Sequence, residues 1–558
     1  MKKIIAALLT ALMLFSVCSL GVVAIGDIDK PTNQIIVHSS RSQIPVIRIL
    51  GDGEPLYNKE QEKIFHIRSM TSGALSSDDE DSDLLSSVAN ILLPFLVDGL
   101  LKDEWDAYYE NLQKEISEIF SEIILDPNGE VTNGSGISEA RKKEMADDLK
   151  QDFKKTRGYY QINDYRFWYD WRLDPIYTAD RLHEHIQKVK TVTGCPKVSI
   201  MASCLGTIVT TAYITKYGTD DLHGVGFTGS VSGGAEALSE AISGKFDING
   251  YAISRTLIDS DYIGEFNVDK FVTSSIELLT AVGVFDYLED GVKETLYAKL
   301  VEGVTSALAL STLFSFPNYW AAVSPEDYDA AMLHVFGPKG SEKRKTYAGL
   351  IEKIENYNNT VRKNYDATIR SIGKNGVLFG AVSKYGFQIL PICKSYDVVS
   401  DQFVSVTHSS FGAKTSKLHN TLTDDYIQSR VEAGFADYIS PDKKVDASTC
   451  AYPESTWFMK NVSHSEYTTF ERKLLYDVIT ADKQIKCGDV VDGLRYSRFL
   501  VYDYETDIMT TMTTENCNTE NWAADKDTEE PQTIFEKILV RLTAFFNWIA
   551  SLFNFLKK

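Results

Sequence analysis

The pattern of apolar and polar positions predicts short strands that alternate with amphipathic helices in the middle of the chain. The expected elements are, in order, an aromatic strand ending at Tyr169, a helix over 179–192, a strand over 197–203, a helix from Leu205 and a strand over 223–229. Gly194 and Gly218 follow the two helices, where a left-handed residue commonly ends a helix. This order predicts an α/β fold with a mostly parallel sheet and helices on both faces.

The rest of the chain divides around this pattern. An apolar run over 44–50, ended by a Gly-Asp-Gly-Glu-Pro turn, predicts an earlier strand, and strand-like segments resume from 386 to about 501. The expected organisation is a signal peptide (1–24), the start of the core (33–57), a helical insertion (58–155), core with a sharp strand-to-helix turn (156–234), a helical cap (235–385), the C-terminal part of the core (386–513), an acidic linker (514–533) and an amphipathic helix (534–556).

The N-terminal pattern predicts export from the cell. Two lysines precede an apolar run over 4–17, and Val22 and Ala24 have the small side chains expected just before a cleavage site. A lipoprotein signal ending at Cys18 is the alternative. We therefore expect a secreted or extracellular protein, either free or peripheral on the outer face of the membrane.

The C-terminal pattern predicts a helix with one broad apolar face. Apolar residues recur at spacings of three and four over 534–556, and this face carries several Phe together with Trp548. Such a helix suits the plane of a membrane interface, and docking on the protein's own core or on a partner is the alternative.

Composition and charge narrow the classes of function. The 558 residues are 44% hydrophobic, which excludes a disordered chain, and the formal charge of −21 disfavours nucleic acid as a partner. The cysteines that remain after removal of the signal peptide form no C-x-x-C pair, and the histidines are scattered along the chain. We therefore expect no metal site, and nothing in the sequence indicates a cofactor. A disulfide between Cys450 and Cys487 is left open, because spacing alone does not establish one.

The segment Ala202-Ser203-Cys204-Leu205-Gly206 predicts a nucleophile at the turn between strand and helix. Such a turn needs small residues two before and two after the nucleophile, because strand and helix approach closely there. Ala202 and Gly206 satisfy this requirement around Cys204. A thiol at a helix N-terminus beside a histidine is more readily converted to the nucleophilic thiolate. The alternative interpretation is an inert buried cysteine at a strand end.

A second segment competes for the same role. Ser230-Val231-Ser232-Gly233-Gly234 also follows a strand and also has the pattern small-x-Ser-x-Gly. It would make Ser232 the nucleophile. Short runs of serine and glycine match such patterns by chance, so we rank it second.

The partners of the nucleophile are expected later in the chain. A hydrolase with this turn places its acid and then its histidine after late strands. We assign the acid to Asp442, in a Pro-containing turn expected after a strand, with Asp446 as the competing acid, and the histidine to His464. Backbone N–H groups of Leu205 and of Asp52, or of its neighbour Gly53, would form the oxyanion hole.

With these residues in place, the chain resembles the lecithin:cholesterol acyltransferase family of α/β-hydrolases. The resemblance rests on the block Tyr-Asp-Trp-Arg-Leu-Asp-Pro at 169–175 followed by 202–206, is clearest over 159–234 and extends to 44–57 and 436–470. It implies an α/β-hydrolase fold with helical cap insertions, a structural turn at Ser232, and an acid and histidine at Asp442 and His464. The chain departs from the family by carrying Cys204 where the family has serine.

Together these features predict a secreted enzyme that hydrolyses or transfers an acyl group of a lipid or another ester. Cys204 would be the nucleophile, His464 the general base and acid, and Asp442 the residue orienting the imidazole. A thiol hydrolase acting on peptides or small lactones would use the same residues. The hypothesis from a different class is a non-catalytic lipid-binding or surface protein that keeps the fold.

Overall fold

The computed structural model describes residues 28–30, 44–51, 55–65, 104–108, 120–151, 164–245, 313–389, 393–504 and 506–517, with single positions at 110, 114 and 153. The expected signal peptide, about half of the helical insertion, the middle of the cap and the amphipathic helix at 534–556 lie outside these residues.

The centre of the protein is an eight-stranded sheet in the order β16-β15-β11-β8-β7-β6-β2-β5. Its strands are β2 (Val46–Ile49), β5 (Asp164–Arg166), β6 (Val198–Ser203), β7 (Leu222–Thr228), β8 (Leu378–Tyr385), β11 (Thr456–Lys460), β15 (Phe499–Asp503) and β16 (Ile508–Thr511). All neighbours run parallel except β16, which runs antiparallel to β15. The expected mostly parallel α/β sheet is confirmed.

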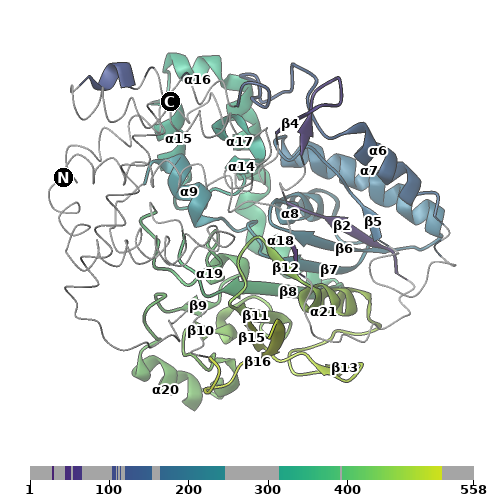
Figure 1. Ribbon diagram of the computed structural model, residues 1–558, viewed down its shortest axis with the longest axis vertical. Helices are drawn as coiled ribbons and strands as arrows, with labels where there is room; N and C mark the ends of the chain where they lie inside the picture. The colour runs from purple at the N-terminus through teal and green to yellow at the C-terminus, as the bar shows by residue number, and fades with distance from the viewer. Residues whose placement is uncertain are drawn as a thin grey trace, which may run out of the picture.

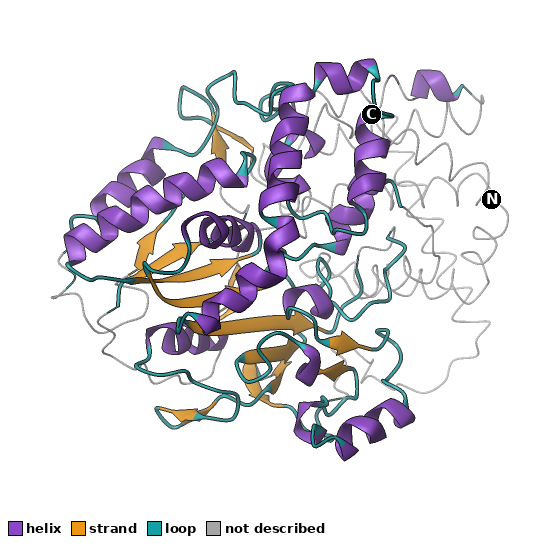
Figure 2. Ribbon diagram, turned by 180° about the vertical axis from the view of Figure 1, so that it is seen from behind, coloured by secondary structure: helices purple, strands orange, loops and turns teal. Residues whose placement is uncertain are grey.

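Helices cover both faces of this sheet (Figures 1 and 2). Helices α7 (Pro175–Thr193), α8 (Leu205–Tyr217) and α18 (Tyr365–Lys374) pack on one face, and α21 (Thr469–Thr480) packs on the other. Every residue of β6 is buried, as expected for a strand of a parallel sheet that is covered on both faces.

The remaining described helices surround this core. They are α6 (Glu139–Asp148), α9 (Glu236–Ser243), α14 (Pro317–Trp320), α15 (Tyr328–Phe336), α16 (Glu342–Thr346), α17 (Ala348–Thr360), α19 (Val406–Ser409) and α20 (Asp424–Glu432), with 3-10 turns η4 (Leu313–Ser315), η5 (Arg362–Asn364), η6 (Ala436–Tyr438) and η7 (Ala447–Thr449).

Short strand pairs complete the structure. They are β1 (Ile28–Lys30) with β12 (Glu466–Thr468), β3 (Leu56–Tyr57) with β4 (Lys63–Phe65), β9 (Lys414–Thr415) with β10 (Val445–Asp446), and β13 (Val490–Val491) with β14 (Leu494–Arg495).

The helix ends follow the sequence signals. Gly194 ends α7 at a φ of 68°, and Gly218 ends α8 at a φ of 76°, as the sequence predicts. Asp174 begins α7 because its side chain accepts a hydrogen bond from the amide of Ile176 and Pro175 occupies the first helical turn.

Three expectations differ from the structure. Strand β8 lies within the segment 235–385 expected to be cap, so the sheet resumes earlier than the sequence indicates. The segment expected to be strand-like from 386 contains helices α20 and α21. No strand precedes Asp442; that stretch is the 3-10 turn η6 and a loop.

Within the described residues no helix combines the length and the apolar character that crossing a membrane requires.

The contact between α21 and the sheet depends on glycine. A Cβ on Gly224 of β7 would lie 2.7 Å from the Cα of Ile479 in α21, and Gly226 and Gly380 present equally small surfaces to the same helix. Helix α21 therefore approaches the sheet at backbone distance.

We predict that Gly224→Ala lowers the free energy of unfolding by about 1–3 kcal/mol, because the backbone of α21 must move away from the sheet. Gly136→Ala is the matched control, since its added Cβ would make only an ordinary 3.5 Å contact with Asp170. Urea unfolding of both variants measures the difference, and equal stabilities would contradict the close approach.

Candidate functional site

Cys204 occupies a strained turn between β6 and α8. Its backbone lies at φ 45° and ψ −126°, a region that residues other than glycine rarely adopt and that costs about 1–3 kcal/mol. A Cβ on Gly206 would lie 2.9 Å from the carbonyl carbon of Ile49, and a Cβ on Gly51 would lie 2.8 Å from the Cβ of Cys204. The sharp turn predicted around Cys204 is therefore present, and the predicted small residue at Gly206 is required by its approach to β2.

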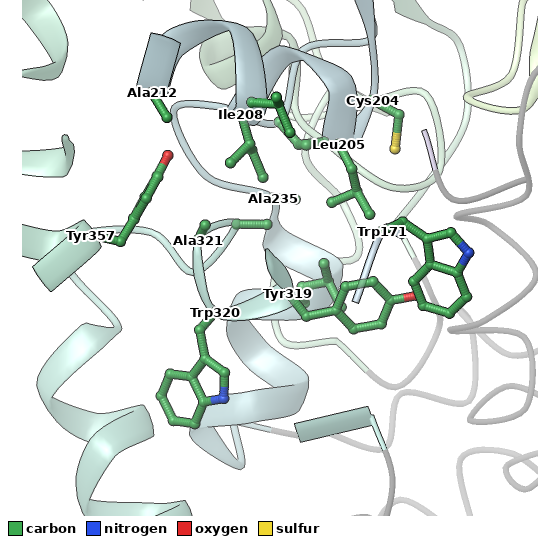
Figure 3. Close-up of a cluster of buried hydrophobic side chains, with 14 of the residues drawn as sticks. Trp171, Cys204, Leu205, Ile208, Ala212, Ala235, Tyr319, Trp320, Ala321 and Tyr357 are labelled. Atoms are coloured by element: carbon green, nitrogen blue, oxygen red, sulfur yellow. The ribbon is translucent and has the colours of Figure 1, made fainter. Parts of the chain in front are cut away.

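The thiol lies in an apolar environment. Cys204 is 6% exposed and belongs to the buried hydrophobic cluster that includes Trp171, Leu205 and Ile208 (Figure 3). A nucleophile in such surroundings reacts in a water-poor site, where electrostatic interactions are stronger than in bulk water.

Residues of the block at 169–175 pack beside this turn. The hydroxyl of Tyr169 donates to the carbonyl of Leu50 at 2.9 Å, directly before Gly51. Trp171 is fully buried and stacks on Tyr319 at a centroid distance of 5.8 Å. The block thus holds the end of β2 against Cys204 and joins it to α14.

The same block contains a buried ion pair. Arg172 is fully buried and donates to both carboxylate oxygens of Asp170, at 2.9 and 2.6 Å. It also donates to the carbonyl of Ile123 and to the hydroxyl of Ser135. These contacts tie the segment before α7 to the described part of the expected insertion.

His464 forms a buried pair with Asp401. Its Nδ1 lies 2.8 Å from Oδ2 of Asp401, and its backbone amide donates to the carbonyl of Asp401 at 2.7 Å. The second carboxylate oxygen of Asp401 accepts from the amides of Phe403 and Val404 at 3.1 and 3.0 Å. Both carboxylate oxygens are therefore hydrogen-bonded, and the carboxylate is aimed at the imidazole.

The assignment of Asp442 as the partner of His464 is thus wrong in this structure. Asp442 instead accepts from Ser440 at 2.6 Å and from Tyr385 at 3.1 Å, and pairs with Lys460 at 3.3 Å. The physical reason is that the loop carrying Asp442 is anchored by the charged Lys460 at the end of β11 and does not extend to the imidazole.

The competing acid Asp446 is also engaged elsewhere. It is fully buried, pairs with Arg430 at 2.9 Å and accepts from Tyr426 at 2.7 Å. Neither of the two aspartates considered from the sequence orients His464.

Gly229 connects His464 with Cys204. The amide of Cys204 donates to the carbonyl of Thr228 at 3.3 Å, and a Cβ on the next residue, Gly229, would lie 3.2 Å from Cε1 of His464. Thiol and imidazole are thus brought to the same edge of the sheet. Nε2 of His464 is buried and has no hydrogen-bond partner among the described residues. Because Nδ1 is committed to Asp401, Nε2 is the nitrogen that is left to accept a proton.

Ser232 does not occupy a comparable turn. Its hydroxyl is 2.9 Å from that of Ser230 and 3.3 Å from that of Tyr365, and the residue is 1% exposed. Arg362 donates to its carbonyl at 2.9 Å. Ser232 therefore belongs to a hydrogen-bonded turn that carries no side chain positioned like the thiol of Cys204.

The expected oxyanion hole is described only in part. The amide of Leu205 is the first of α8, where helical amides lack intrahelical partners. Asp52 and Gly53 lie outside the described residues. Gly51, the first residue of that turn, is described and lies close to the thiol. A Cβ added to Gly51 would lie 3.3 Å from Sγ of Cys204 and 3.7 Å from the amide nitrogen of Leu205.

Sequence reasoning missed Asp401 and Gly51. Asp401 comes after β8, which lies in the segment that the sequence pattern assigns to the cap, so that pattern predicts no strand end before Asp401. The run Val398-Val399-Ser400-Asp401 does place an acid after an apolar pair. Gly51 was regarded only as part of a turn, although its position after a predicted strand is the available signal.

Cys450 and Cys487 form no disulfide in this structure, so the pairing left open by the sequence is not formed. Burial raises the pKa of Cys450 to about 11 and raises the pKa values of Cys393, Cys487 and Cys517 above the usual range. These four thiols are poor nucleophiles near neutral pH. Within the described part of the chain no three His, Cys, Asp or Glu side chains gather as a metal site would require.

The sequence matches no known protein-family model and no curated protein.

A histidine–glutamate pair holds the loop that carries Asp401. His408 of α19 lies 2.9 Å from Glu236 at the start of α9, and the second carboxylate oxygen of Glu236 accepts from the amide of Ser405 at 2.8 Å. Glu326 lies 3.8 Å from the other ring nitrogen. Burial and the charge of Arg362 disfavour the protonated form of His408, but the Glu236 carboxylate outweighs them and raises the pKa of His408. Burial also disfavours the ionised form of Glu236, but His408 outweighs it and lowers the pKa of Glu236.

We predict a pH-dependent contribution of this ion pair to stability. Because the pKa of His408 is raised by folding, its contribution to stability is fully present below the unfolded pKa of about 6.5 and is lost as pH rises through the folded pKa. Because the pKa of Glu236 is lowered by folding, its contribution is present above the unfolded pKa of about 4.3 and is lost as pH falls through the folded pKa. His408→Asn should therefore destabilise the protein more at pH 5.5 than at pH 9, by about 1 kcal/mol or more. Urea unfolding at both pH values measures this, and Glu236→Gln should reduce the same pH dependence to the smaller part that Glu326 supports. An equal loss at both pH values would contradict the charged state of His408.

Proposed function

We propose that the protein is an α/β-hydrolase-fold enzyme that hydrolyses or transfers acyl groups, with Cys204 as nucleophile, His464 as general base and acid, and Asp401 as the residue that orients the imidazole. The observation that carries this proposal is the strained backbone of Cys204 at the β6–α8 turn, together with a buried His464–Asp401 pair. The imidazole of that pair packs against Gly229, and the preceding residue, Thr228, accepts from the amide of Cys204. Strain of this kind persists where the surrounding structure holds a functional side chain in place.

The positions of the three residues along the sheet support the proposal. Cys204 follows β6, Asp401 comes after β8 and His464 comes after β11, so all three lie beyond the carboxyl ends of parallel strands. This is where open α/β sheets place their sites, and the chain order nucleophile, acid, histidine is that of α/β-hydrolases.

In the proposed reaction, Nε2 of His464 accepts the thiol proton and the sulfur attacks the carbonyl carbon of an ester. The developing oxyanion would be stabilised by the amide of Leu205. When the carbon–oxygen bond to the alcohol breaks, the imidazolium returns the proton to the departing oxygen, leaving a thioester on Cys204. Water or a second alcohol, deprotonated by His464, then attacks the thioester and releases the thiolate, which is reprotonated.

The substrate class follows from the apolar surroundings of the thiol. The sequence favours a lipid or another ester, and the buried aromatic residues beside Cys204 are compatible with an acyl chain. Export through the N-terminal signal and peripheral membrane contact through 534–556 belong to the same proposal, resting on the sequence alone.

A second candidate function is a non-catalytic lipid-binding or surface protein. The observation in its favour is that the thiol is 6% exposed and Nε2 of His464 has no hydrogen-bond partner among the described residues. Hydrogen bonds between catalytic groups are often long in the absence of substrate, so this geometry is also compatible with an enzyme.

We predict that Asp401→Asn lowers kcat/KM for p-nitrophenyl esters by about 10³–10⁴-fold, because the imidazole loses the carboxylate that fixes its tautomer. Cys204→Ala should abolish activity. Asp397→Asn in the same loop is the matched control, since Asp397 pairs with the exposed side chain of Lys417. Assays over esters of increasing chain length would also show whether long acyl chains are preferred.

Two further variants distinguish the assignments. Asp442→Asn and Ser232→Ala should retain the specific activity of their folded fraction. Activity that survives Cys204→Ala but disappears in Ser232→Ala would overturn the proposed nucleophile. Full activity in Asp401→Asn with loss in Asp442→Asn would overturn the proposed acid.

Alkylation separates the enzyme from the non-catalytic candidate. Iodoacetamide at neutral pH should label Cys204 to one equivalent, faster than Cys393, Cys450, Cys487 and Cys517, whose thiols burial keeps protonated. Peptide mass spectrometry identifies the labelled residue. Folded protein in which Cys204 stays unlabelled would favour the non-catalytic candidate.

A further inference from the structure

A buried charge pair contacts the loop that carries His464. Lys384 of β8 is 1% exposed and Glu471 in the first turn of α21 is fully buried. The ammonium nitrogen of Lys384 lies 3.7 Å from Oε1 of Glu471. Removing two charges from water is costly and a pair of apolar side chains often stabilises a core as well, so overall stability alone does not account for this pair.

Lys384 binds the backbone of the loop that carries His464. Its ammonium donates to the carbonyl of His464 at 3.2 Å and to the carbonyl of Glu466 at 2.6 Å. Lys384 lies opposite Met459 in the parallel pairing of β8 with β11. One side chain on a rigid strand thus fixes the backbone on both sides of Ser465.

Glu471 connects the same pair with the nucleophile. Its Oε1 accepts from the hydroxyl of Thr228, and the backbone carbonyl of Thr228 accepts from the amide of Cys204 at 3.3 Å. Its Oε2 accepts from the amide of Thr468 at 3.3 Å, which closes a capping box at the start of α21. The carboxylate therefore contacts both the strand end beside the thiol and the segment following the imidazole.

We propose that Lys384 and Glu471 are positioning residues that set how closely the imidazole of His464 approaches the thiol of Cys204. This inference rests on the proposed function, because it assigns the pair a role in setting the distance between the nucleophile Cys204 and the base His464. Charged hydrogen bonds are shorter and more directional than apolar contacts, so this pair fixes the loop geometry where an apolar pair would only fill space.

The chain offers a matched control on the same helix. Lys473 is 1% exposed and pairs with the buried Asp477, while the other contacts shown for its ammonium are with Tyr496 and Asp492. Replacing Lys473 removes an equally buried cation from α21 without removing a contact to the His464 loop.

The test is the pH dependence of iodoacetamide alkylation at Cys204 in the full chain, followed by peptide mass spectrometry. His464→Ala should raise the midpoint pH of alkylation by about one unit or more, because the thiol loses the imidazole that accepts its proton. The double variant Lys384→Met/Glu471→Gln, which removes both charges together, should reproduce at least half of that shift. Lys473→Met should leave the profile as in the unchanged protein.

Folding is checked by circular dichroism and thermal unfolding. Should the double variant fail to fold, Thr228→Val removes the hydroxyl that Glu471 holds, without altering charge, and should shift the midpoint in the same direction. A shift in His464→Ala without any shift in the double variant or in Thr228→Val would overturn the positioning role and leave the proposed function intact. An unchanged profile in His464→Ala would overturn the proposed function itself.

Discussion

The site depends on one backbone conformation, the left-handed φ of Cys204 where β6 passes into α8. Two glycines make that conformation accessible, because Gly206 lets the helix approach the end of β2 and Gly51 leaves room for the Cβ of Cys204. The turn places the thiol of Cys204 directly before the first amide of α8. Without the close packing of β2, β6 and α8, the strain would relax and the thiol would be an ordinary buried side chain.

The second constraint is the cost of burying polar groups, which the protein meets by satisfying them with hydrogen bonds. Asp401 accepts two backbone amides in addition to facing His464. Lys384 and Glu471 bind carbonyl, amide and hydroxyl groups of the strand ends around them. Such networks are effective only when nearly complete, because a buried group without a partner is destabilising. Nε2 of His464 is one of the buried side-chain atoms that have no hydrogen-bond partner among the described residues.

Local patterns in the sequence were enough for the parallel sheet, the helix ends at Gly194 and Gly218, and the turn at Cys204, because each depends on residues adjacent in the chain. The partner of His464 was not accessible in this way. Asp401 is 63 residues away along the chain, in an irregular loop whose course is set by tertiary contacts, including the amide of His464 donating to its carbonyl. Asp442 has an equally suitable local sequence, and its tertiary contacts with Lys460 and Tyr385 explain why it is held elsewhere.

The most direct test of the account is to trap the acyl group itself. Full-length protein mixed with p-nitrophenyl acetate, quenched in acid within the first turnovers and digested, should carry a single acetyl group on the peptide that contains Cys204, and hydroxylamine should remove it as it removes a thioester. An acetyl group on Ser232 instead, or folded protein with no acetyl group on Cys204 while the ester is consumed, would contradict the claim that this thiol is the nucleophile.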